Sequence, residues 1–163
     1  MTAQLQDVSS GLDARELRNT FGNFATGVTV VTYEHEGQVL GATVNSFTSV
    51  SMKPALVLVS LMRSSKVGQL LDGRPFAVNI LNDAQHATAL QFAGKPQDGH
   101  AIEWNLDGVA PRLADSLAWF TCRPWRQYDG GDHVLVVGEV AGFGHRPDAE
   151  PLVFYRGGWR AVS

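Results

Sequence analysis

The sequence has little of several residue types and patterns, and each scarcity excludes a class of protein. Cysteine occurs once, as Cys122, so no disulfide can form within the chain and a cytoplasmic, reducing environment is expected. The longest nearly continuous apolar run, residues 55–62, is too short to cross a bilayer. Residues 1–10 lack the apolar stretch of a signal peptide, so no membrane association is expected. The net charge is -3 without a basic block, which argues against nucleic-acid binding.

The signature motifs of several enzyme classes are also missing. The chain has no G-x-S-x-G elbow, no Walker loop and no G-x-G-x-x-G after a strand. Its five histidines show no metal-ligand spacing among themselves or with Cys122. The acidic residues form no obvious carboxylate pair. A metal enzyme or a two-carboxylate hydrolase is therefore not expected.

What remains is the composition of one globular domain. The chain has 163 residues, of which 44% are hydrophobic and 18% charged, enough to build a core without disulfides. Residues 1–12 are predicted to be a polar N-terminal tail, and residues 13–163 to be a single domain. Cys122 is interpreted as a small buried hydrophobe.

Short strands dominate the predicted secondary structure. A capping box at Asp13 and Glu16 predicts a helix over 14–24, with an apolar face of Leu17, Phe21 and Phe24. A second helix is predicted over 83–92, with Asp83 as its N-cap, and a short one over 64–71. The predicted strands span 27–33 and 39–43, which form a hairpin, 56–60, buried on both faces, 76–81, 117–125, 133–142, 152–155 and 159–162. Residues 94–116 are predicted to be a long surface excursion. About seven strands with few helices predict a mainly β protein with short helices, an antiparallel barrel rather than a doubly wound sheet.

Three segments carry more polar or flexible residues than a purely structural barrel needs. Residues 41–51, GATVNSFTSVS, leave a strand as a run of small donors and acceptors, and this run is typical either of an ordinary loop or of a site for a flat ligand. Residues 63–66, RSSK, open a short helix and could bind phosphate or simply cap the helix. His133 follows Gly130-Gly131-Asp132, which favours a place at the mouth of the barrel, although a lone histidine is often structural.

Taken in order, these and other segments resemble a known family. ATGVTVVT at 25–32, GATVNSFTSVS at 41–51, FAVNIL at 76–81, QFA at 91–93 and GDH at 131–133 resemble the flavin reductase component of two-component flavin-dependent monooxygenases. The resemblance spans nearly everything from Leu17 to Trp159. It implies an FMN-binding split β-barrel of antiparallel, Greek-key type and a homodimer.

The resemblance also implies roles for individual residues. Asn45 and Ser46 would be the closest polar contacts of the flavin ring, and Lys66 would hold the flavin phosphate. The full implied flavin set is Thr43, Asn45, Ser46, Val50, Ser51, Ser60, Leu61, Met62, Ser65, Lys66, Gln91 and Phe92. The implied nicotinamide set is Gly41, His133, Phe154, Tyr155, Arg156 and Gly157.

The function that follows from the resemblance is hydride transfer from NADH, rather than NADPH, to FMN or FAD. The reduced flavin would leave for a separate monooxygenase. Such transfer needs alignment of two cofactors and no protein acid or base, so no catalytic dyad is expected and His133 is assigned to positioning. Two alternatives stay open: a split-barrel enzyme that keeps its flavin and acts on its own organic substrate, and a non-catalytic flavin-binding protein.

Overall fold

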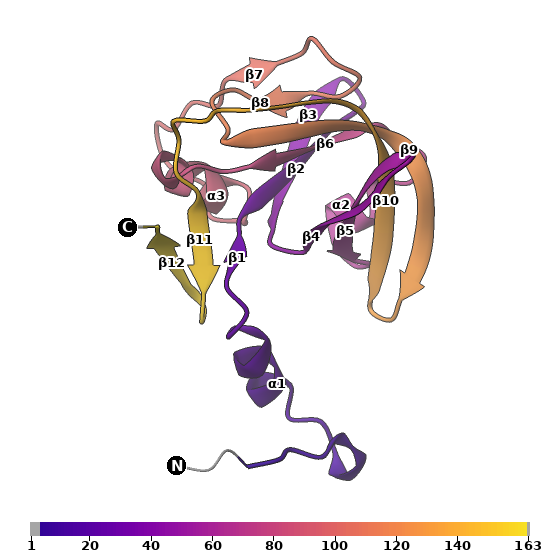
Figure 1. Cartoon of the computed structure of the whole chain (residues 1–163), viewed down its shortest axis with the longest axis vertical. Coiled ribbons are helices and arrows are strands. Elements are labelled where there is room, and N and C mark those ends of the chain that lie inside the picture. The colour runs from indigo at the N-terminus through magenta and orange to yellow at the C-terminus, as the bar shows by residue number, and fades with distance from the viewer. Residues whose placement is uncertain (1–3, 163) are drawn as a thin grey trace.

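The computed structural model describes residues 4–162, and its centre is an antiparallel seven-stranded sheet with the order β3-β2-β6-β9-β10-β5-β4. This sheet curls around its core, and β3 and β4 are its two edges (Figure 1). Its strands are β2 (Thr29–His35), β3 (Gln38–Val44), β4 (Phe47–Met52), β5 (Ala55–Met62), β6 (Phe76–Ile80), β9 (Ala118–Gly130) and β10 (His133–His145). The predicted class, a mainly β antiparallel split barrel with short helices, is confirmed.

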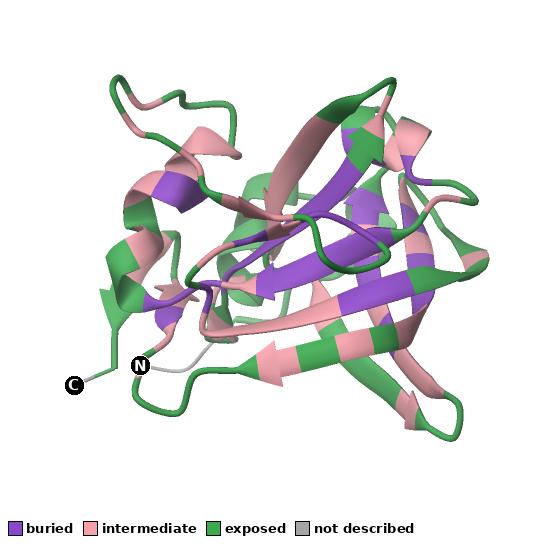
Figure 2. Ribbon diagram, turned by 90° about the horizontal axis from the view of Figure 1, so that it is seen from above, coloured by how far each residue is buried: buried purple, intermediate pink, exposed green. Residues whose placement is uncertain are grey.

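The core fills the inside of the curled sheet, where buried residues gather on its central strands (Figure 2). Val31, Val59, Phe76 and Val78 are among its fully buried members. Each such side chain contributes roughly 1.5–3 kcal/mol when removed from water. Cys122 is also fully buried, as predicted, and burial raises the pKa of its thiol to about 12.

One prediction about this core is wrong. The strand predicted over 56–60 was expected to be buried on both faces, but only alternate side chains of β5 are buried, namely Val57, Val59 and Leu61. Its other face remains half-buried. Since side chains of a strand alternate between two faces, a one-sided strand can still be continuously apolar in sequence.

Two hairpins frame the barrel. β2 and β3 turn at Glu36 and Gly37, both at positive φ, which confirms the predicted hairpin. β9 and β10 turn at Gly131, with a φ of 75°, and pair along their whole length. Both strands run further than the predicted 117–125 and 133–142, because two bulges in the pairing let a long ribbon bend without ending.

The polar segment after β3 contains a strand that the sequence did not reveal. β4 (Phe47–Met52) pairs only with β5 and is mostly exposed. An edge strand with serine and threonine on its solvent side lacks the apolar alternation by which strands are recognised. The strands β7 (Trp104–Asn105) and β8 (Arg112–Leu113) were also missed, because two residues are too few to show an alternation.

Residues 94–116 are not the purely surface excursion that was predicted, because part of this segment is buried against the sheet. Ala110 and Leu113 are buried. The side-chain amide of Asn79, on β6, donates to the Val30 carbonyl at 2.8 Å, and its oxygen accepts from the backbone N–H of Leu113 at 2.8 Å. The hydroxyl of Thr32 donates to the Pro111 carbonyl. The hydrogen bonds of Asn79 and Thr32 therefore hold residues 94–116 against the barrel.

The helices are shorter than predicted. α1 (Ala14–Phe21) ends three residues before the expected position 24, and of the predicted capping box the described residues show only the Asp13 half. The predicted helix 83–92 is a 3-10 turn, η2 (Asp83–Gln85), followed by α3 (His86–Gln91), and its N-cap is Asn82 rather than Asp83. Asn82 forms the capping box with Gln85, which leaves Asp83 inside the first turn. α2 (Lys66–Leu70) lies within the predicted 64–71.

A second, small sheet lies beside the barrel. β1 (Thr26–Gly27), β11 (Leu152–Tyr155) and β12 (Gly158–Ala161) form it, and α1 projects from β1 away from the barrel (Figure 1). The segment that precedes this sheet in the chain and contains α1 is called the N-terminal arm. A 3-10 turn, η1 (Val8–Ser10), precedes α1, and the predicted boundary between tail and domain at residue 12 stays a prediction. Positions 1–3 and 163 of these segments lie outside the described residues. Across residues 4–162, no helix is long and apolar enough to cross a membrane.

Candidate functional site

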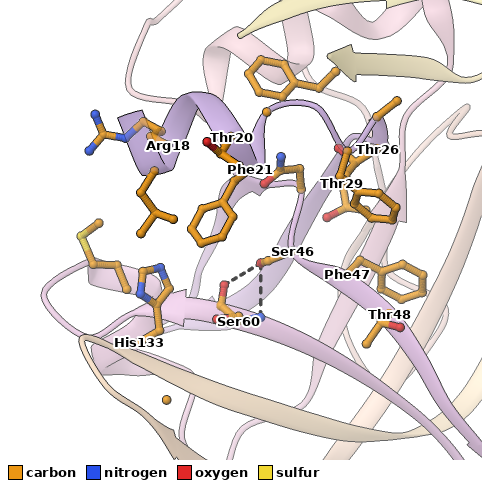
Figure 3. A pocket seen from close by; sticks show the side chains of 18 of the residues that line it. Arg18, Thr20, Phe21, Thr26, Thr29, Ser46, Phe47, Thr48, Ser60 and His133 are labelled. Carbon is orange, nitrogen blue, oxygen red and sulfur yellow. Dashed lines mark hydrogen bonds between the residues drawn. The ribbon is translucent and has the colours of Figure 1, made fainter. Parts of the chain in front are cut away.

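A cleft of about 1650 Å³ opens between α1, β1 and the adjoining mouth of the barrel. One wall is the arm, with Leu17, Arg18 and Phe21. The opposite wall is the start of β10 with His133, and the floor is the turn between β3 and β4 (Figure 3). Six of the residues that the sequence assigned to cofactors line it: Asn45, Ser46, Ser60, Met62, His133 and Phe154.

The floor of the cleft is fixed by a reciprocal link between β3–β4 and β5. The hydroxyl of Ser46 donates to the Ser60 carbonyl at 2.6 Å, and the Ser60 N–H donates to both the carbonyl and the hydroxyl of Ser46 at 3.2 Å. The Phe47 ring stacks on Phe120 at 5.6 Å. Ser46 is therefore already engaged within the protein, whereas the exposed side chain of Asn45 faces the cleft.

The opposite wall presents a histidine held by its neighbour. His133 Nδ1 lies 2.7 Å from Asp132 Oδ1, and this hydrogen bond is the main reason why the pKa of Asp132 is lowered. A carboxylate only accepts, so the hydrogen lies on Nδ1 and leaves Nε2 unprotonated in the neutral ring. The turn itself is braced by Arg63, whose Nε donates to the Gly131 carbonyl at 2.9 Å and whose backbone N–H donates to the Asp132 carbonyl at 3.0 Å.

A second set of predicted residues packs β3 against α3 and does not line the cleft. The Thr43 hydroxyl donates to the Ala89 carbonyl at 2.7 Å, and its N–H donates to the Phe92 carbonyl. A Cβ at Gly41 would lie 2.9 Å from the Phe92 ring, so glycine permits the close packing. Gln91 accepts from the Gln97 N–H at 2.7 Å. The cofactor roles predicted for these four residues stay predictions.

The remaining flavin-assigned residues also lie outside the cleft lining. Leu61 belongs to the barrel core. The Ser65 hydroxyl donates to the Met62 carbonyl and accepts from the Gly68 N–H, which makes it the N-cap of α2. Lys66 is exposed at the start of that helix. Val50 and Ser51 lie further along β4, where the hydroxyl of Ser51 accepts from the Lys53 N–H.

The turn between β11 and β12 holds the arm. Arg156 has a φ of 48°, and Gly157 follows at 73°. The Arg156 N–H donates to the Gly22 carbonyl at 2.9 Å, and its Nε donates to Asn23 Oδ1 at 2.8 Å, while its guanidinium lies over the Tyr155 ring. Of the four residues assigned to this turn, only Phe154 lines the cleft.

Several lining residues escaped sequence reasoning. Arg18 and Phe21 were assigned to an ordinary amphipathic helix, yet none of the residues of α1 is buried and Phe21 is 69% exposed. Thr26 also lines the cleft, and its buried hydroxyl has no hydrogen-bond partner within residues 4–162. The available signal was the apolar spacing of a short helix, which does not say whether the helix covers a core or a ligand.

The cleft suits a large planar ligand. It exceeds the roughly 300–1000 Å³ of ordinary ligand pockets, and its walls combine small residues with Phe21, Phe47 and Phe154. Thr26 and Asn45 offer polar groups for such a ligand. Within the described residues no group of three His, Cys, Asp or Glu side chains could hold a metal ion. The arrangement can bind and align molecules.

Comparison with known proteins gives a consistent result. Residues 21–163 match the model of the family described as "Flavin reductase like domain". The chain is 41% identical over 90% of its length to a probable flavin reductase of Rhizobium meliloti, of which it spans about half (48%). It is 39% identical to the reductase component of a 4-nitrophenol 4-monooxygenase/4-nitrocatechol 2-monooxygenase of Rhodococcus opacus, covering 93% of this chain and 83% of that one. The solved NADH:FAD oxidoreductase of Streptomyces globisporus superposes with a TM-score of 0.88 at 35% identity, over 100% of this chain and 99% of that chain.

Proposed function

The chain belongs to the flavin reductase-like domain family, and on that premise we propose that it transfers a hydride from NADH to FMN or FAD. The reduced flavin then serves a separate flavin-dependent monooxygenase. The observation that carries this proposal is the large cleft between α1 and the barrel mouth, which brings Asn45 and His133 to one space.

The residues of the cleft fit a flavin. Its volume and its aromatic and small side chains accommodate a tricyclic ring, and the unpaired hydroxyl of Thr26 offers a buried hydrogen-bonding group that residues 4–162 do not satisfy. When bound, the flavin supplies the hydride-accepting chemistry, so the protein need only bind and align. No acid–base pair is required in the cleft.

The chain's own residues would orient the two cofactors from opposite walls. The side-chain amide of Asn45 would offer a hydrogen bond to a polar group of the flavin, while the Ser46–Ser60 link keeps the floor rigid. His133, fixed by Asp132, would offer Nε2 to the carboxamide of the nicotinamide. Rigid walls hold the reacting atoms in a near-attack arrangement and thereby raise the rate.

The nicotinamide cofactor is proposed to be NADH. A 2′-phosphate site ordinarily needs a cluster of arginine or lysine side chains, and among the described residues only Arg18 supplies such a cation to the cleft lining. A kcat/KM for NADPH equal to that for NADH would contradict this preference.

We also propose a homodimer. Phe21 and Phe24 are 69% and 81% exposed, and Phe143 is 75% exposed, which leaves more apolar surface on the arm and barrel than a monomer ordinarily shows. A monomeric mass by light scattering at micromolar concentration would refute the dimer.

The decisive experiment measures NADH and NADPH oxidation under air with no flavin, with riboflavin, with FMN and with FAD. The proposal expects strong acceleration of NADH oxidation by at least one added flavin at micromolar concentration. A yellow purified protein that free flavin does not stimulate would favour an enzyme that retains its flavin. Flavin binding without NADH oxidation would favour a binding protein.

A further inference from the structure

The cleft has an uneven distribution of charge. Among its described lining residues, Arg18 is the one arginine or lysine and Asp132 is the one carboxylate. The two stand on different walls, because Arg18 belongs to α1 and Asp132 directly precedes His133, the first residue of β10. Figure 3 shows Arg18 and His133 on these two walls. Because the hydrogen bond from His133 lowers the pKa of Asp132, this carboxylate stays ionised. An anionic group entering the cleft is attracted to the arm and repelled from the opposite wall.

Arg18 is available for such a group. The ion pairs of residues 4–162 engage Arg63, Arg112 and Arg146 but not Arg18. Arg18 lies in the last turn of α1, where the helix dipole favours a cation. Its guanidinium lies at the outer edge of the cleft (Figure 3). A ligand whose ring lies deeper in the cleft would therefore meet Arg18 with its solvent-side end.

The position of α1 depends on contacts at its end, since none of its residues is buried. An isolated helix of eight residues is marginal in water. Arg156 holds the end of the helix at two points, the Gly22 carbonyl and Asn23 Oδ1, and the amide of Asn23 donates back to the carbonyls of Asn19 and Thr20. The turn between β11 and β12 thus places the helix, and Arg18 with it, at the cleft.

We propose that Arg18 binds a phosphate group of the nucleotide held in the cleft, with Arg156 as a positioning residue. The proposal rests on the function proposed above and names a phosphate contact for the same site. A guanidinium offers paired donors to a phosphate, which makes arginine well suited to this group. The rival assignment to Lys66 and Ser65 has less support. Lys66 is not in the cleft lining, and the Ser65 hydroxyl already donates to the Met62 carbonyl and accepts from the Gly68 N–H.

Two nucleotides carry this chemistry, the flavin with its ribityl phosphate and the dinucleotide with its pyrophosphate. The test therefore compares ligands that differ only in the phosphate. The dissociation constants of FMN and riboflavin are measured by quenching of flavin fluorescence, and those of nicotinamide mononucleotide and nicotinamide riboside by calorimetry. The proteins are the wild type, Arg18→Ala and Arg18→Lys. Arg15→Ala is the matched control on the same helix, and Lys66→Ala tests the rival.

The expected result is that Arg18→Ala weakens the binding of FMN or of nicotinamide mononucleotide by about tenfold or more, as the loss of a charge-assisted hydrogen bond implies. The matching ligand without phosphate loses less than about twofold, and Arg18→Lys restores part of the loss because the charge remains. Which of the two ligand pairs shows the effect identifies the nucleotide. Arg15→Ala should bind all four ligands like the wild type.

Arg156→Gln sharpens the test of positioning. It should reduce the discrimination between the phosphorylated and unphosphorylated ligand. Adding Arg18→Ala to Arg156→Gln should weaken the phosphorylated ligand little further than Arg18→Ala alone does, because the two residues act in series. A general loss of stability would not change this discrimination.

The proposal is overturned if Arg18→Ala weakens both members of each pair equally, or neither. It is also overturned if Lys66→Ala alone removes the discrimination. A wild-type protein that binds FMN tightly but does not oxidise NADH refutes the proposed function and leaves the Arg18 comparison measurable. A protein that binds none of the four ligands refutes both.

Discussion

Asn79 and Ile80 are neighbours on β6, yet they face two regions that differ in whether a buried polar group has a hydrogen-bond partner. Asn79 is fully buried, and each end of its amide has a partner within the barrel and the excursion over it. Ile80 lines the cleft, where the Thr26 hydroxyl lacks a partner within residues 4–162 and Phe21 stands exposed. A buried amide with a partner at each end indicates a structural role, whereas a buried hydroxyl without a partner beside a cleft is available to a ligand. The two roles should therefore be separable by mutation.

The largest effect is expected at Asn79. Asn79→Ala removes partners from the Val30 carbonyl, the Thr32 hydroxyl and the Leu113 N–H, all buried. Unsatisfied buried groups cost roughly 1–3 kcal/mol each, so the free energy of unfolding should fall by about 3 kcal/mol or more. Urea titration measures this loss, and Gln38→Ala, an exposed change on β3, is the control.

Flavin affinity tests whether the two regions are separate. The Asn79→Ala protein that remains folded should bind FMN within about twofold of the wild type, since Asn79 does not line the cleft. A variant of unchanged stability with weakened FMN binding would show that the excursion and the cleft are one unit.

A smaller loss of stability is expected at Gly41. In Gly41→Ala the new Cβ would lie 2.9 Å from Phe92 Cδ1 and 3.2 Å from Val30 Cγ1, and overpacking of this kind costs roughly 1–3 kcal/mol. Because Gly41 packs against α3, the KM for NADH should not change. In a Phe92→Leu background the added methyl should be tolerated better, which identifies the clash as the cause.

The sequence assigned Gly41 to the nicotinamide, so the opposite outcome is informative. A Gly41→Ala protein with wild-type melting temperature and a raised KM for NADH would support that assignment. It would also contradict the separation between packed and ligand-binding regions at this position.

How far the sequence could predict the fold depended on how strongly each element showed its buried face. The bounds of β2, β3 and β6 were predicted to within two residues, because β-branched runs and a Gly turn are local signals. β4 escaped, since an exposed edge strand of serine and threonine has the composition of a loop. The bulges that lengthen β9 and β10 depend on pairing between strands, and no local pattern shows them.

The candidate site was predictable only in part. Asn45, Ser46, Ser60 and His133 were named from the sequence and do line the cleft. The contribution of α1 was not foreseen, because the apolar spacing of Leu17, Phe21 and Phe24 is the same for a helix that covers a core. Their exposure depends on where β1 points the arm, which is a property of the tertiary fold.

A third prediction concerns the packed region at high pH. Burial raises the pKa of the Cys122 thiol from 9.0 to about 12. Between these values the unfolded chain has lost the proton and the folded chain has kept it, so stability falls as the pH rises. Linkage gives a loss of about 1.4 kcal/mol between pH 8 and pH 10 from this group. Burial also raises the pKa of Tyr33, which acts in the same direction.

Cys122→Ala isolates the contribution of the thiol. The variant is less stable at every pH because of the cavity, but its stability should decline less steeply between pH 8 and pH 10. Denaturant titrations at both pH values measure the two slopes. Parallel slopes for variant and wild type would show that the thiol is not shielded from water.

The smallest effect, and the one most specific to the cleft, is expected at His133. Its ring lies 2.7 Å from Asp132 and is partly exposed, so its removal should leave the melting temperature nearly unchanged. His133→Ala should raise the KM for NADH several-fold, because the carboxamide of the nicotinamide loses a partner, while the dissociation constant of FMN stays constant. Asp132→Asn should give a weaker change in the same direction, since an amide no longer fixes the hydrogen on Nδ1. If the folded His133→Ala protein keeps its KM for NADH, then His133 does not lie on the nicotinamide side. If it loses flavin affinity instead, this wall of the cleft binds the flavin and the assignment of the two walls must be reversed.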